Sequence, residues 1–324
     1  MANDALIAIG EVLIDFIPDK KGCEFYEVTS FSPAVGGAPA NVCGAFSKLG
    51  GKSKMITQLG NDPFGDKITR RLKEADIDTS CISYTDKANT ALAFVSLAKD
   101  GNRTFSFYRK PSADMLFDKD TLKKEWFDDC YAMHFCSVSL GDFPMRDAHE
   151  RAIEYARKNG ALISFDPNLR FQLWDDKEAL RETVRKFIPL ADILKISDEE
   201  LEFITGEADI DKALPWLFSG NVKLVLYTLG NKGAYAITPS IKLFDPPYKV
   251  NVADTTGAGD GFIGSFLWKL KEKSVDAISI SDINEVTLKE ALNFANKFCA
   301  ISVQYPGAID SYPGHETMKL KFIK

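Results

Sequence analysis

The sequence is poor in the residues that build metal centres and disulfide frameworks. It has three histidines, and its six cysteines include no Cys-x-x-Cys pair. Zinc sites need closely spaced cysteine and histidine ligands, so this spacing predicts no zinc site. Cys43, Cys136 and Cys299 lie among apolar residues. We therefore expect buried thiols in a reducing compartment.

Long hydrophobic runs and an excess of positive charge are also missing. No stretch approaches 18 uninterrupted apolar residues, and no basic segment followed by an apolar one comes after Met1. We therefore expect neither a membrane span nor a signal peptide. The net charge of −6 gives no reason to expect a nucleic-acid partner. With 324 residues, 45% of them hydrophobic, the chain is predicted to be a cytoplasmic protein of one domain, residues 1–324.

Short apolar segments alternate with amphipathic ones along most of the chain. This alternation predicts an α/β fold, doubly wound, with a mainly parallel central sheet flanked by helices. The predicted strands are residues 6–9, 54–59, 131–138, 161–165, 192–196 and 222–228, and the predicted helices are residues 40–49, 66–75, 146–158, 177–187, 199–204, 260–270 and 293–302.

Other segments have the alternating pattern of exposed strands. Residues 90–98 and 104–108 alternate apolar and polar side chains around Lys99-Asp100-Gly101-Asn102, a good hairpin turn. Residues 24–31 are a further candidate. Such strands suit a small β lid, which we place at about residues 12–35 and 88–112. Exposed edges favour pairing between two lids, so a homodimer through the lid is expected.

The most informative stretch is residues 250–262, which contains Asp254-Thr255-Thr256-Gly257-Ala258-Gly259-Asp260. It runs from a strand-like segment through a glycine turn into a predicted helix, whose N-terminus can hold an anion. Gly257 and Gly259 let backbone N–H groups converge on a phosphoryl oxygen. Asp260 is placed to accept the proton of an attacking hydroxyl. The competing interpretation is a glycine-rich turn in which Asp260 only caps the helix.

A second group of residues suits a sugar. Asp15 follows the first strand, and a carboxylate there can accept hydrogen bonds from two neighbouring hydroxyls. Gly36 and Gly37 would admit a sugar close to the backbone, and Asn41 can both donate and accept. Taken alone, Asp15 would be a solvated loop acid and Asn41 a first-turn helix residue.

Phe107-Tyr108-Arg109 follows the predicted hairpin. The aromatic ring of Phe107 can cover the apolar face of a sugar, and Arg109 can reach an anionic phosphate. The alternative is a strand with one inward aromatic side chain and a surface arginine.

Two of these motifs resemble the signatures of the ribokinase-like (PfkB) carbohydrate kinases: residues 254–260 and Gly36-Gly37-Ala38-Pro39-Ala40-Asn41. The resemblance spans essentially the whole chain. It implies a central sheet flanked by helices, a β lid over the sugar, and ATP with Mg²⁺. It also implies that Asp260 is the catalytic base, with an anion hole at Gly257, Ala258 and Gly259, and that Asp15, Gly36, Gly37, Asn41, Phe107 and Arg109 contact the substrate.

The same resemblance assigns the nucleotide and metal side. Asn168 and Arg170 are expected near the phosphates or the acceptor. The ATP loop is expected at Thr228, Gly230 and Gly233, with Asn296 facing the adenine, and Asp254 and Thr256 at a possible K⁺ site. The family usually has Asn-x-x-Glu where this chain has Ser197-Asp198-Glu199-Glu200. Glu200 is thus expected to organise Mg²⁺ through water, whereas a helix-capping role competes for Ser197.

Within the family, the chain is most similar to bacterial-type fructokinases, as judged by residues 10–15, 60–65, 104–109, 165–170 and 173–174. The implied reaction transfers the γ-phosphoryl group of ATP to the 6-hydroxyl of fructose. Two alternatives stay open. One is a 2-keto-3-deoxygluconate kinase or another sugar kinase of the family, and the other is an inactive sugar-binding or scaffold protein.

Overall fold

The structure is a computed structural model that describes residues 3–20, 22–23, 25–97 and 103–320. Within these residues ten strands form the central sheet, in the order β14-β13-β12-β11-β10-β9-β1-β4-β5, with β6 also paired to β4. Pairing is parallel from β5 and β6 through β12, and β13 and β14 are antiparallel. The strands are β1 (Ala5–Ile9), β4 (Lys52–Gly60), β5 (Ile77–Asp78), β6 (Ile82–Thr85), β9 (Cys130–Cys136), β10 (Leu162–Asp166), β11 (Ile193–Ser197), β12 (Leu224–Thr228), β13 (Ala234–Ile237) and β14 (Lys242–Asp245).

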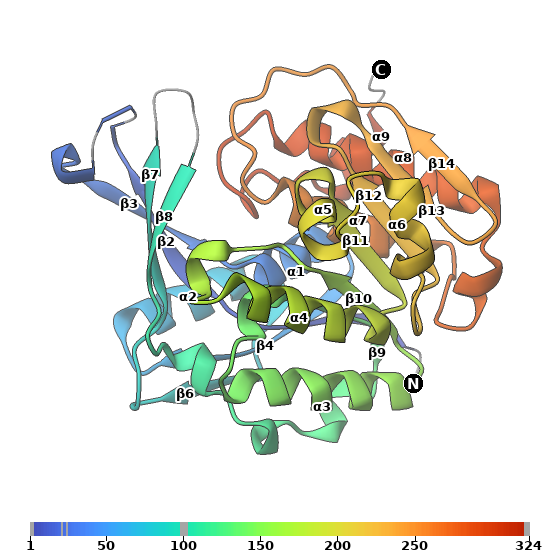
Figure 1. The fold of residues 1–324 in the computed structure, drawn as a ribbon. Helices are drawn as coiled ribbons and strands as arrows, with labels where there is room; N and C mark the ends of the chain where they lie inside the picture. Colours follow the sequence, from blue (N-terminus) through green and yellow to red (C-terminus); the bar gives the residue numbers. More distant parts are fainter. Residues whose placement is uncertain (1–2, 21, 24, 98–102, 321–324) are drawn as a thin grey trace.

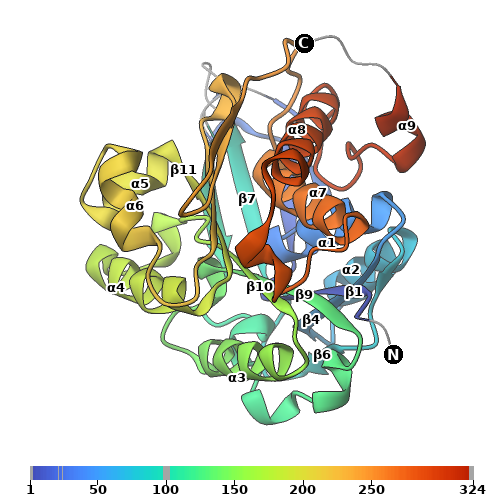
Figure 2. The same ribbon diagram turned by 90° about the vertical axis from the view of Figure 1, so that its right-hand side faces the viewer.

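Helices cover both faces of this sheet, and Figure 2 shows the two helical layers on opposite sides of the strands. One hydrophobic core lies under α3 (Pro144–Lys158), α4 (Lys177–Phe187), α5 (Asp198–Thr205) and α6 (Ile210–Leu217). The opposite face packs against α1 (Ala38–Lys48), α7 (Ala258–Glu272) and α8 (Glu285–Ser302). Next to α1 are α2 (Pro63–Glu74) and the short α9 (His315–Lys319). The predicted fold class is thus confirmed.

A second sheet stands to one side of the central one (Figure 1). Its order is β3 (Phe31–Gly36), β2 (Leu13–Pro18), β7 (Leu92–Leu97) and β8 (Arg103–Tyr108). The two predicted hairpin strands pair as β7 and β8, and their antiparallel register joins Leu92 to Tyr108. The predicted turn at residues 99–102 lies outside the described residues. That this sheet acts as a lid stays a prediction.

Two local predictions are wrong. Residues 25–30 do not form a strand: Phe25–Glu27 is a 3₁₀ turn, and β3 begins only at Phe31. Residue 24 of the predicted strand lies outside the described residues. The ring of Phe25 packs against those of Phe31 and Phe94, so the chain curls back onto the small sheet.

The strand-like segment before the glycine turn is also irregular. The backbone N–H groups of Ala253 and Asp254 both donate to the carbonyl of Val303, at 2.8 and 3.1 Å. This segment therefore follows the end of α8 instead of a sheet edge. No helix in the described part of the chain has the length and apolar character needed to cross a bilayer.

Candidate active site

The polar residues singled out by the sequence gather where the parallel strands end. Asp166, Ser197 and Thr228 are the last residues of β10, β11 and β12, and these strands are neighbours in the sheet. In doubly wound sheets, ligands bind outside the carboxyl ends of the strands. The N-terminus of α7 reaches the same place, since Gly259 in its first turn approaches the side chain of Lys195 on β11.

Asp260 lies in the first turn of α7 and is only 9% exposed. The side-chain amide of Asn41 donates to its Oδ2 at 2.8 Å, so the two sequence motifs, 219 residues apart, meet directly. The N-cap residue of α7 is Gly257, so the capping interpretation of Asp260 does not hold.

The surroundings of Asp260 raise its pKa from 3.8 to about 6. Burial is the main cause, and the carboxylate of Asp166 adds to it. The hydrogen bond from Asn41 and the positive charges of Lys195 and Arg170 act in the opposite direction. A carboxylate with this pKa is mostly ionised at neutral pH and can accept a proton close to that pH, as a general base must.

Residues outside the 254–260 motif hold the glycine turn before α7 in place. Gly257 has a φ of 71°, and its carbonyl accepts a hydrogen bond of 2.7 Å from the Tyr312 hydroxyl. A Cβ on Gly257 would lie 2.6 Å from both the Cβ of Ala308 and that hydroxyl. The carbonyl of Ala258 accepts from the Cys299 thiol at 3.1 Å. Because the C=O and N–H of a trans peptide point in opposite directions, the Gly259 N–H points away from Cys299.

Sequence reasoning missed Lys195. It lies on β11 and is buried, and its Nζ donates to Asp166 Oδ2 at 2.7 Å. Burial alone would lower the pKa of Lys195, but the carboxylates of Asp166, Glu200 and Asp260 raise it above its ordinary value. The available signal was a lysine inside an apolar strand of a parallel sheet, because such strands are buried on both faces.

On the sugar side, Asp15 and Phe107 share one face of the small sheet, since both are directly opposite Ala93. The Asp15 carboxylate lies over Gly36: a Cβ on that glycine would be 2.1 Å from Asp15 Oδ2. Gly37 has a φ of 116°, and a Cβ there would lie 2.5 Å from the carbonyl oxygen of Glu11. Gly37 is therefore required by its backbone, whereas a side chain at residue 36 would have to displace the Asp15 carboxylate.

The structure gives the guanidinium of Arg109 partners inside the protein. Its guanidinium is buried and donates from Nε and Nη2 to the carboxylate of Asp114, the Nε contact being 3.0 Å. Nη1 donates to the Val138 carbonyl at 3.0 Å, and Nη2 to Ser139 Oγ at 3.2 Å. Arg109 is thus an internal tie between the end of β8 and the segment after β9. Each of its three nitrogens has a protein acceptor, and a contact of Arg109 with the substrate or a phosphate stays a prediction.

The turn after β10 is shaped by two carboxylates. Asn168 has a φ of 46°, and its N–H donates to Asp166 Oδ1 at 3.2 Å. Glu200 accepts from the Leu169 N–H through Oε1 and from the Ser197 N–H through Oε2, each at 2.9 Å. Ser197 is the N-cap of α5, as its competing interpretation required. A water-mediated magnesium role for Glu200 stays a prediction.

The predicted nucleotide residues lie along β12, β13 and α8. Gly230 and Gly233 close the turn after Thr228, and a Cβ on Gly233 would lie 2.4 Å from the Asp245 carbonyl oxygen. Asn296 on α8 donates to Asp245 Oδ2 at 2.8 Å. Its amide nitrogen therefore ties α8 to the end of β14, and its contact with adenine stays a prediction.

Asp254 and Thr256, the two residues predicted to bind K⁺, are hydrogen-bonded to each other. Asp254 Oδ1 accepts from the N–H and the hydroxyl of Thr256, at 2.8 and 2.7 Å, and its Oδ2 accepts from the Gly307 N–H at 3.0 Å. Within the described residues, no group of three or more His, Cys, Asp or Glu side chains is arranged to hold a metal ion. A magnesium ion held mainly by nucleotide phosphates does not need such a group.

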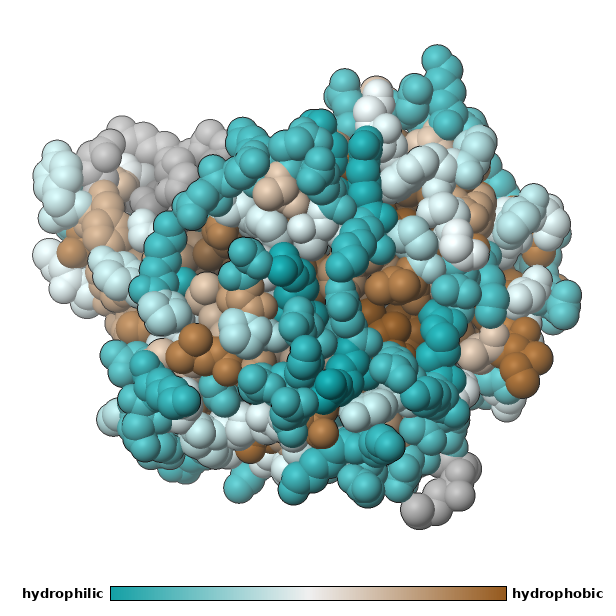
Figure 3. Space-filling model, turned by 60° about the horizontal axis from the view of Figure 1, so that its bottom comes forward, coloured by the Kyte–Doolittle hydropathy of each residue, from teal (hydrophilic) through white to brown (hydrophobic). Residues whose placement is uncertain are grey.

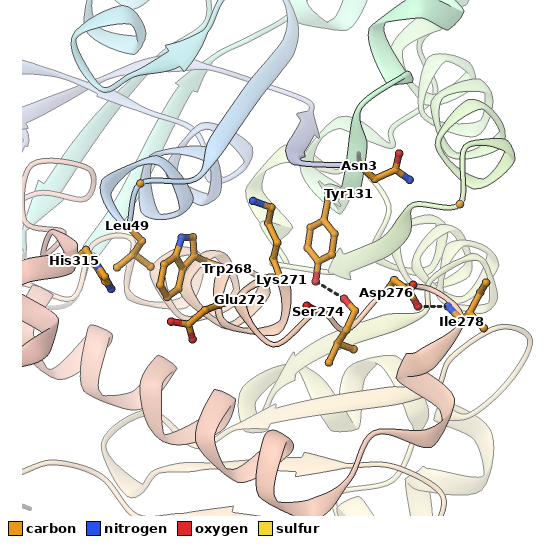
Figure 4. Close-up of a pocket in the computed structure, with 13 residues that line it drawn as sticks. Asn3, Leu49, Tyr131, Trp268, Lys271, Glu272, Ser274, Asp276, Ile278 and His315 are labelled. Carbon is orange, nitrogen blue, oxygen red and sulfur yellow. Dashed lines mark hydrogen bonds between the residues drawn. The ribbon is translucent and has the colours of Figure 1, made fainter. Parts of the chain in front are cut away.

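A cavity of about 940 Å³ lies away from this chemistry, at the other end of α7 (Figure 4). Trp268, Lys271 and Glu272 line it, together with Tyr131 and His315. Tyr131 donates to the Val275 carbonyl, and Lys271 pairs with Asp4. Along α7, at 1.5 Å per residue, the lining residues Trp268 to Glu272 lie about 12 to 18 Å from Asp260. The residues predicted from the sequence do not line it, so we do not assign the active site to it.

Fold and site together define an α/β protein with a buried carboxylate in the first turn of a helix that begins at a glycine turn. The comparison with known families agrees: the family described as "pfkB family carbohydrate kinase" matches residues 3–314. The chain therefore belongs to the PfkB family of carbohydrate kinases, and the resemblance stated from its motifs is confirmed.

Several members of the family that are similar to this chain are named fructokinases. The chain is 44% identical to probable fructokinase-5 of Arabidopsis thaliana over 315 residues, which cover 97% of this chain and 96% of the relative. Among solved structures, it resembles the fructokinase of Xylella fastidiosa with bound ATP, with a TM-score of 0.90, 33% identity, and 98% and 97% of the two chains covered. It also resembles the fructokinase of Vibrio cholerae O395 bound to fructose, ADP and calcium, with a TM-score of 0.84, 31% identity and 98% of each chain covered.

Proposed function

We propose that the protein is an ATP-dependent fructokinase that transfers the γ-phosphoryl group of ATP to the 6-hydroxyl of fructose. The observation that carries this proposal is the buried Asp260 carboxylate, held by Asn41 in the first turn of α7. The fructokinase names of its relatives support fructose as the acceptor.

In this proposal Asp260 accepts the proton of the attacking hydroxyl as its oxygen bonds to the γ-phosphorus. The bond from that phosphorus to the bridging oxygen of ATP breaks, and ADP leaves with the bond's electron pair. The N–H groups of Gly257 and Gly259 would stabilise the charge that develops on the phosphoryl oxygens. The structure corrects the part predicted for Ala258 in the anion hole, because its N–H donates to the Thr255 carbonyl at 3.1 Å. Phosphoryl transfer requires mainly positioning and charge stabilisation, and a preformed turn with one base supplies both. Burial raises the Asp260 pKa to about 6, within about one unit of neutral pH, which favours proton transfer near neutrality.

The sugar would lie between this turn and the Asp15 face of the small sheet, which acts as the lid. Asp15 would bind two hydroxyls, Gly36 and Gly37 would admit the ring, and Phe107 would cover its apolar face. Arg170 is half-buried, and its positive charge already acts on Asp260, so it is placed to meet the acceptor or a phosphate.

ATP would lie along the Thr228–Gly233 turn and α8, near Asn296. Glu200 would hold Mg²⁺ through water, and Asp254 with Thr256 would hold K⁺. The oxygen-rich character of these residues fits such hard cations. Bound Mg²⁺ would neutralise charge on the phosphates. A cytoplasmic location agrees with this proposal, because all six cysteines are free thiols.

The test is a coupled assay of ADP release with fructose, 2-keto-3-deoxygluconate and other sugars. We expect turnover with fructose and a product phosphorylated at C6 by NMR. Faster turnover of 2-keto-3-deoxygluconate than of fructose would show that this acid, and not fructose, is the acceptor. Binding of a sugar without ADP release, by calorimetry, would show the inactive binding protein.

The small sheet also supports the predicted homodimer. Its face opposite Asp15 carries Phe16 and Phe94, whose rings stack at 4.7 Å, and the ring of Tyr108 meets Phe94 at 5.3 Å. Tyr108 is 65% exposed and Tyr26 is 85% exposed. Hydrophobic atoms gather at the surface in this part of the molecule, at the left of Figure 3. Phe16 and Phe94 are half-buried, so Tyr108 is the exposed ring of this face, and its position beside an edge strand favours a second copy.

Sedimentation velocity at micromolar concentration tests the dimer. We expect a species of twice the 35.9 kDa chain mass, and Tyr108→Asp should shift it toward the monomer. A clean monomer of the unchanged protein would contradict the proposal.

A further inference from the structure

A buried lysine lies directly beneath the first turn of α7. Lys195 is on β11, between β10 and β12, and is 6% exposed. A Cβ added to Gly259 would lie 3.3 Å from Lys195 Nζ and 3.5 Å from its Cε. The ammonium group thus packs against the backbone proposed as the anion hole, without being a surface group that could bind solvent freely.

Asp166 fixes the position of this ammonium group. Its Oδ2 accepts from Lys195 Nζ at 2.7 Å, and its Oδ1 accepts from the Asn168 N–H at 3.2 Å. β10 and β11 pair in parallel through Phe165 and Leu194, so Asp166 and Lys195 are the next residues along the two strands. The pair therefore joins β10, β11 and α7 at one point.

Stability alone does not explain such a pair. Removing two charges from water costs free energy that their mutual attraction barely returns, and apolar residues of similar volume often serve stability as well or better. A lysine inside a parallel sheet is therefore better explained by what its charge acts on. The nearest such target is the first turn of α7, where the phosphoryl group gains negative charge during transfer.

We propose that Lys195, held in place by Asp166, is a positioning residue of phosphoryl transfer that supports the anion hole from below. It packs under Gly259, and its positive charge stabilises the charge that develops above that glycine. Charges act strongly there because the site excludes water. This inference rests on the proposed kinase function.

The charge of Lys195 also reaches the base. It lowers the pKa of Asp260 while the carboxylate of Asp166 raises it, so the two partners act in opposite directions. The charged or titratable groups around Asp260 are Asp166 on β10, Arg170 after it, Lys195 on β11, Cys136 on β9, Cys299 on α8 and Tyr312.

Three variants separate charge support from simple stabilisation. Lys195→Met removes the charge and keeps the length of the side chain. Asp166→Asn removes the partner. The double variant removes both charges, so it leaves no unpaired buried ion and is expected to fold. Lys223→Met is the matched control, because Lys223 lies 3.4 Å from the buried Asp192 at the opposite end of β11.

The measurement is the rate of phosphoryl transfer in a single turnover with radiolabelled ATP, together with steady-state kcat, the KM for the sugar and the melting temperature. We expect about a 100-fold loss of rate in both Lys195→Met and the double variant, at the lower end of the loss on removing one oxyanion-hole donor. The KM for the sugar should stay within about twofold. The melting temperature should fall in Lys195→Met and recover in the double variant, and Lys223→Met should keep its rate.

If the Lys195–Asp166 pair served only to stabilise the fold, the double variant would recover both its rate of phosphoryl transfer and its melting temperature. That outcome overturns the inference, as would an equal loss of rate in Lys223→Met. If the unchanged protein turned over a sugar other than fructose, the same comparison would be made with that sugar. If it released no ADP with any sugar, the proposed function and this inference would both fail.

Discussion

Asp260→Asn is expected to abolish turnover and at the same time to stabilise the fold. The folded protein holds the proton of Asp260 more tightly than the unfolded chain does, because burial raises the pKa of this carboxyl from 3.8 to about 6. For an acid shifted in this direction, stability is fully present below the unfolded pKa and is lost as pH rises through the folded pKa. Above pH 6 the protein therefore carries a buried charge that opposes folding.

The size of the expected stabilisation follows from the shift in the pKa of Asp260. A difference of about 2 pKa units, at about 1.4 kcal/mol each, corresponds to about 3 kcal/mol at pH 8. At pH 5 the carboxyl is already largely protonated in the folded state, and only about half of this penalty remains. Asparagine has no charge and nearly the same shape. Its amide can also donate to Asn41 Oδ1, which is buried without a hydrogen-bond partner among the described residues.

Denaturation of both proteins at pH 8 and pH 5, followed by tryptophan fluorescence, checks this reasoning. Asp260→Asn should be more stable by up to about 3 kcal/mol at pH 8 and by about half of that at pH 5. Turnover should fall by about 10²-fold or more as the base is lost. Asp192→Asn is the control: Asp192 is buried but pairs with Arg157 and Lys223, so this change should destabilise. If the increase in the free energy of unfolding did not depend on pH, or were absent at pH 8, Asp260 would not be a buried carboxylate with a raised pKa.

Three further predictions concern the same site. Because Asp260 must be ionised to act, kcat/KM should fall about tenfold per pH unit below pH 6, and initial rates showing a midpoint near pH 4 would contradict its raised pKa. Arg109→Met should lower the free energy of unfolding by about 3–5 kcal/mol, because it leaves Asp114 buried without its partner; an unchanged melting temperature with lost sugar affinity would instead restore the predicted substrate contact. Gly36→Ala should raise the KM for the sugar about tenfold and leave that for ATP unchanged, because the new Cβ would displace Asp15; equal effects on both constants would argue against a sugar site there.

The parts of the site that the sequence predicted are those set by local chemistry. A glycine turn that opens a helix can be recognised without its surroundings, and Gly257 and Asp260 lie as that pattern indicates. The hairpin strands were predicted for a similar reason, since alternation over residues 90–98 and 104–108 reflects the two faces of one strand pair. The same rule failed for the described residues 25–30 of the strand predicted at 24–31, where Phe25 instead packs against Phe31 and Phe94.

Buried charges were the parts that could not be predicted. Arg109 was expected at a phosphate, yet its partner Asp114 lies only five residues further along and takes up the guanidinium inside the protein. The partner of Lys195 is 29 residues away, on the neighbouring strand. The pairing of Lys195 depends on which strand ends lie next to one another after folding, so no local pattern indicates it. The pairing of Arg109 is local in the sequence, but it depends on the 3₁₀ turn of residues 113–116, which the sequence analysis did not predict.

The placement of the base depends on how closely two helices approach. Asn41 is on α1 and Asp260 on α7, so their hydrogen bond exists only if these helices are in tight contact. Gly264, inside α7, makes that contact possible: a Cβ there would lie 2.7 Å from the Val42 carbonyl oxygen and 2.8 Å from the Ala45 Cβ. A glycine inside a helix costs about 1 kcal/mol relative to alanine. Here the close approach that it permits sets the distance between the two halves of the site, so the geometry of the proposed base is fixed by packing one turn further along the helix that carries it.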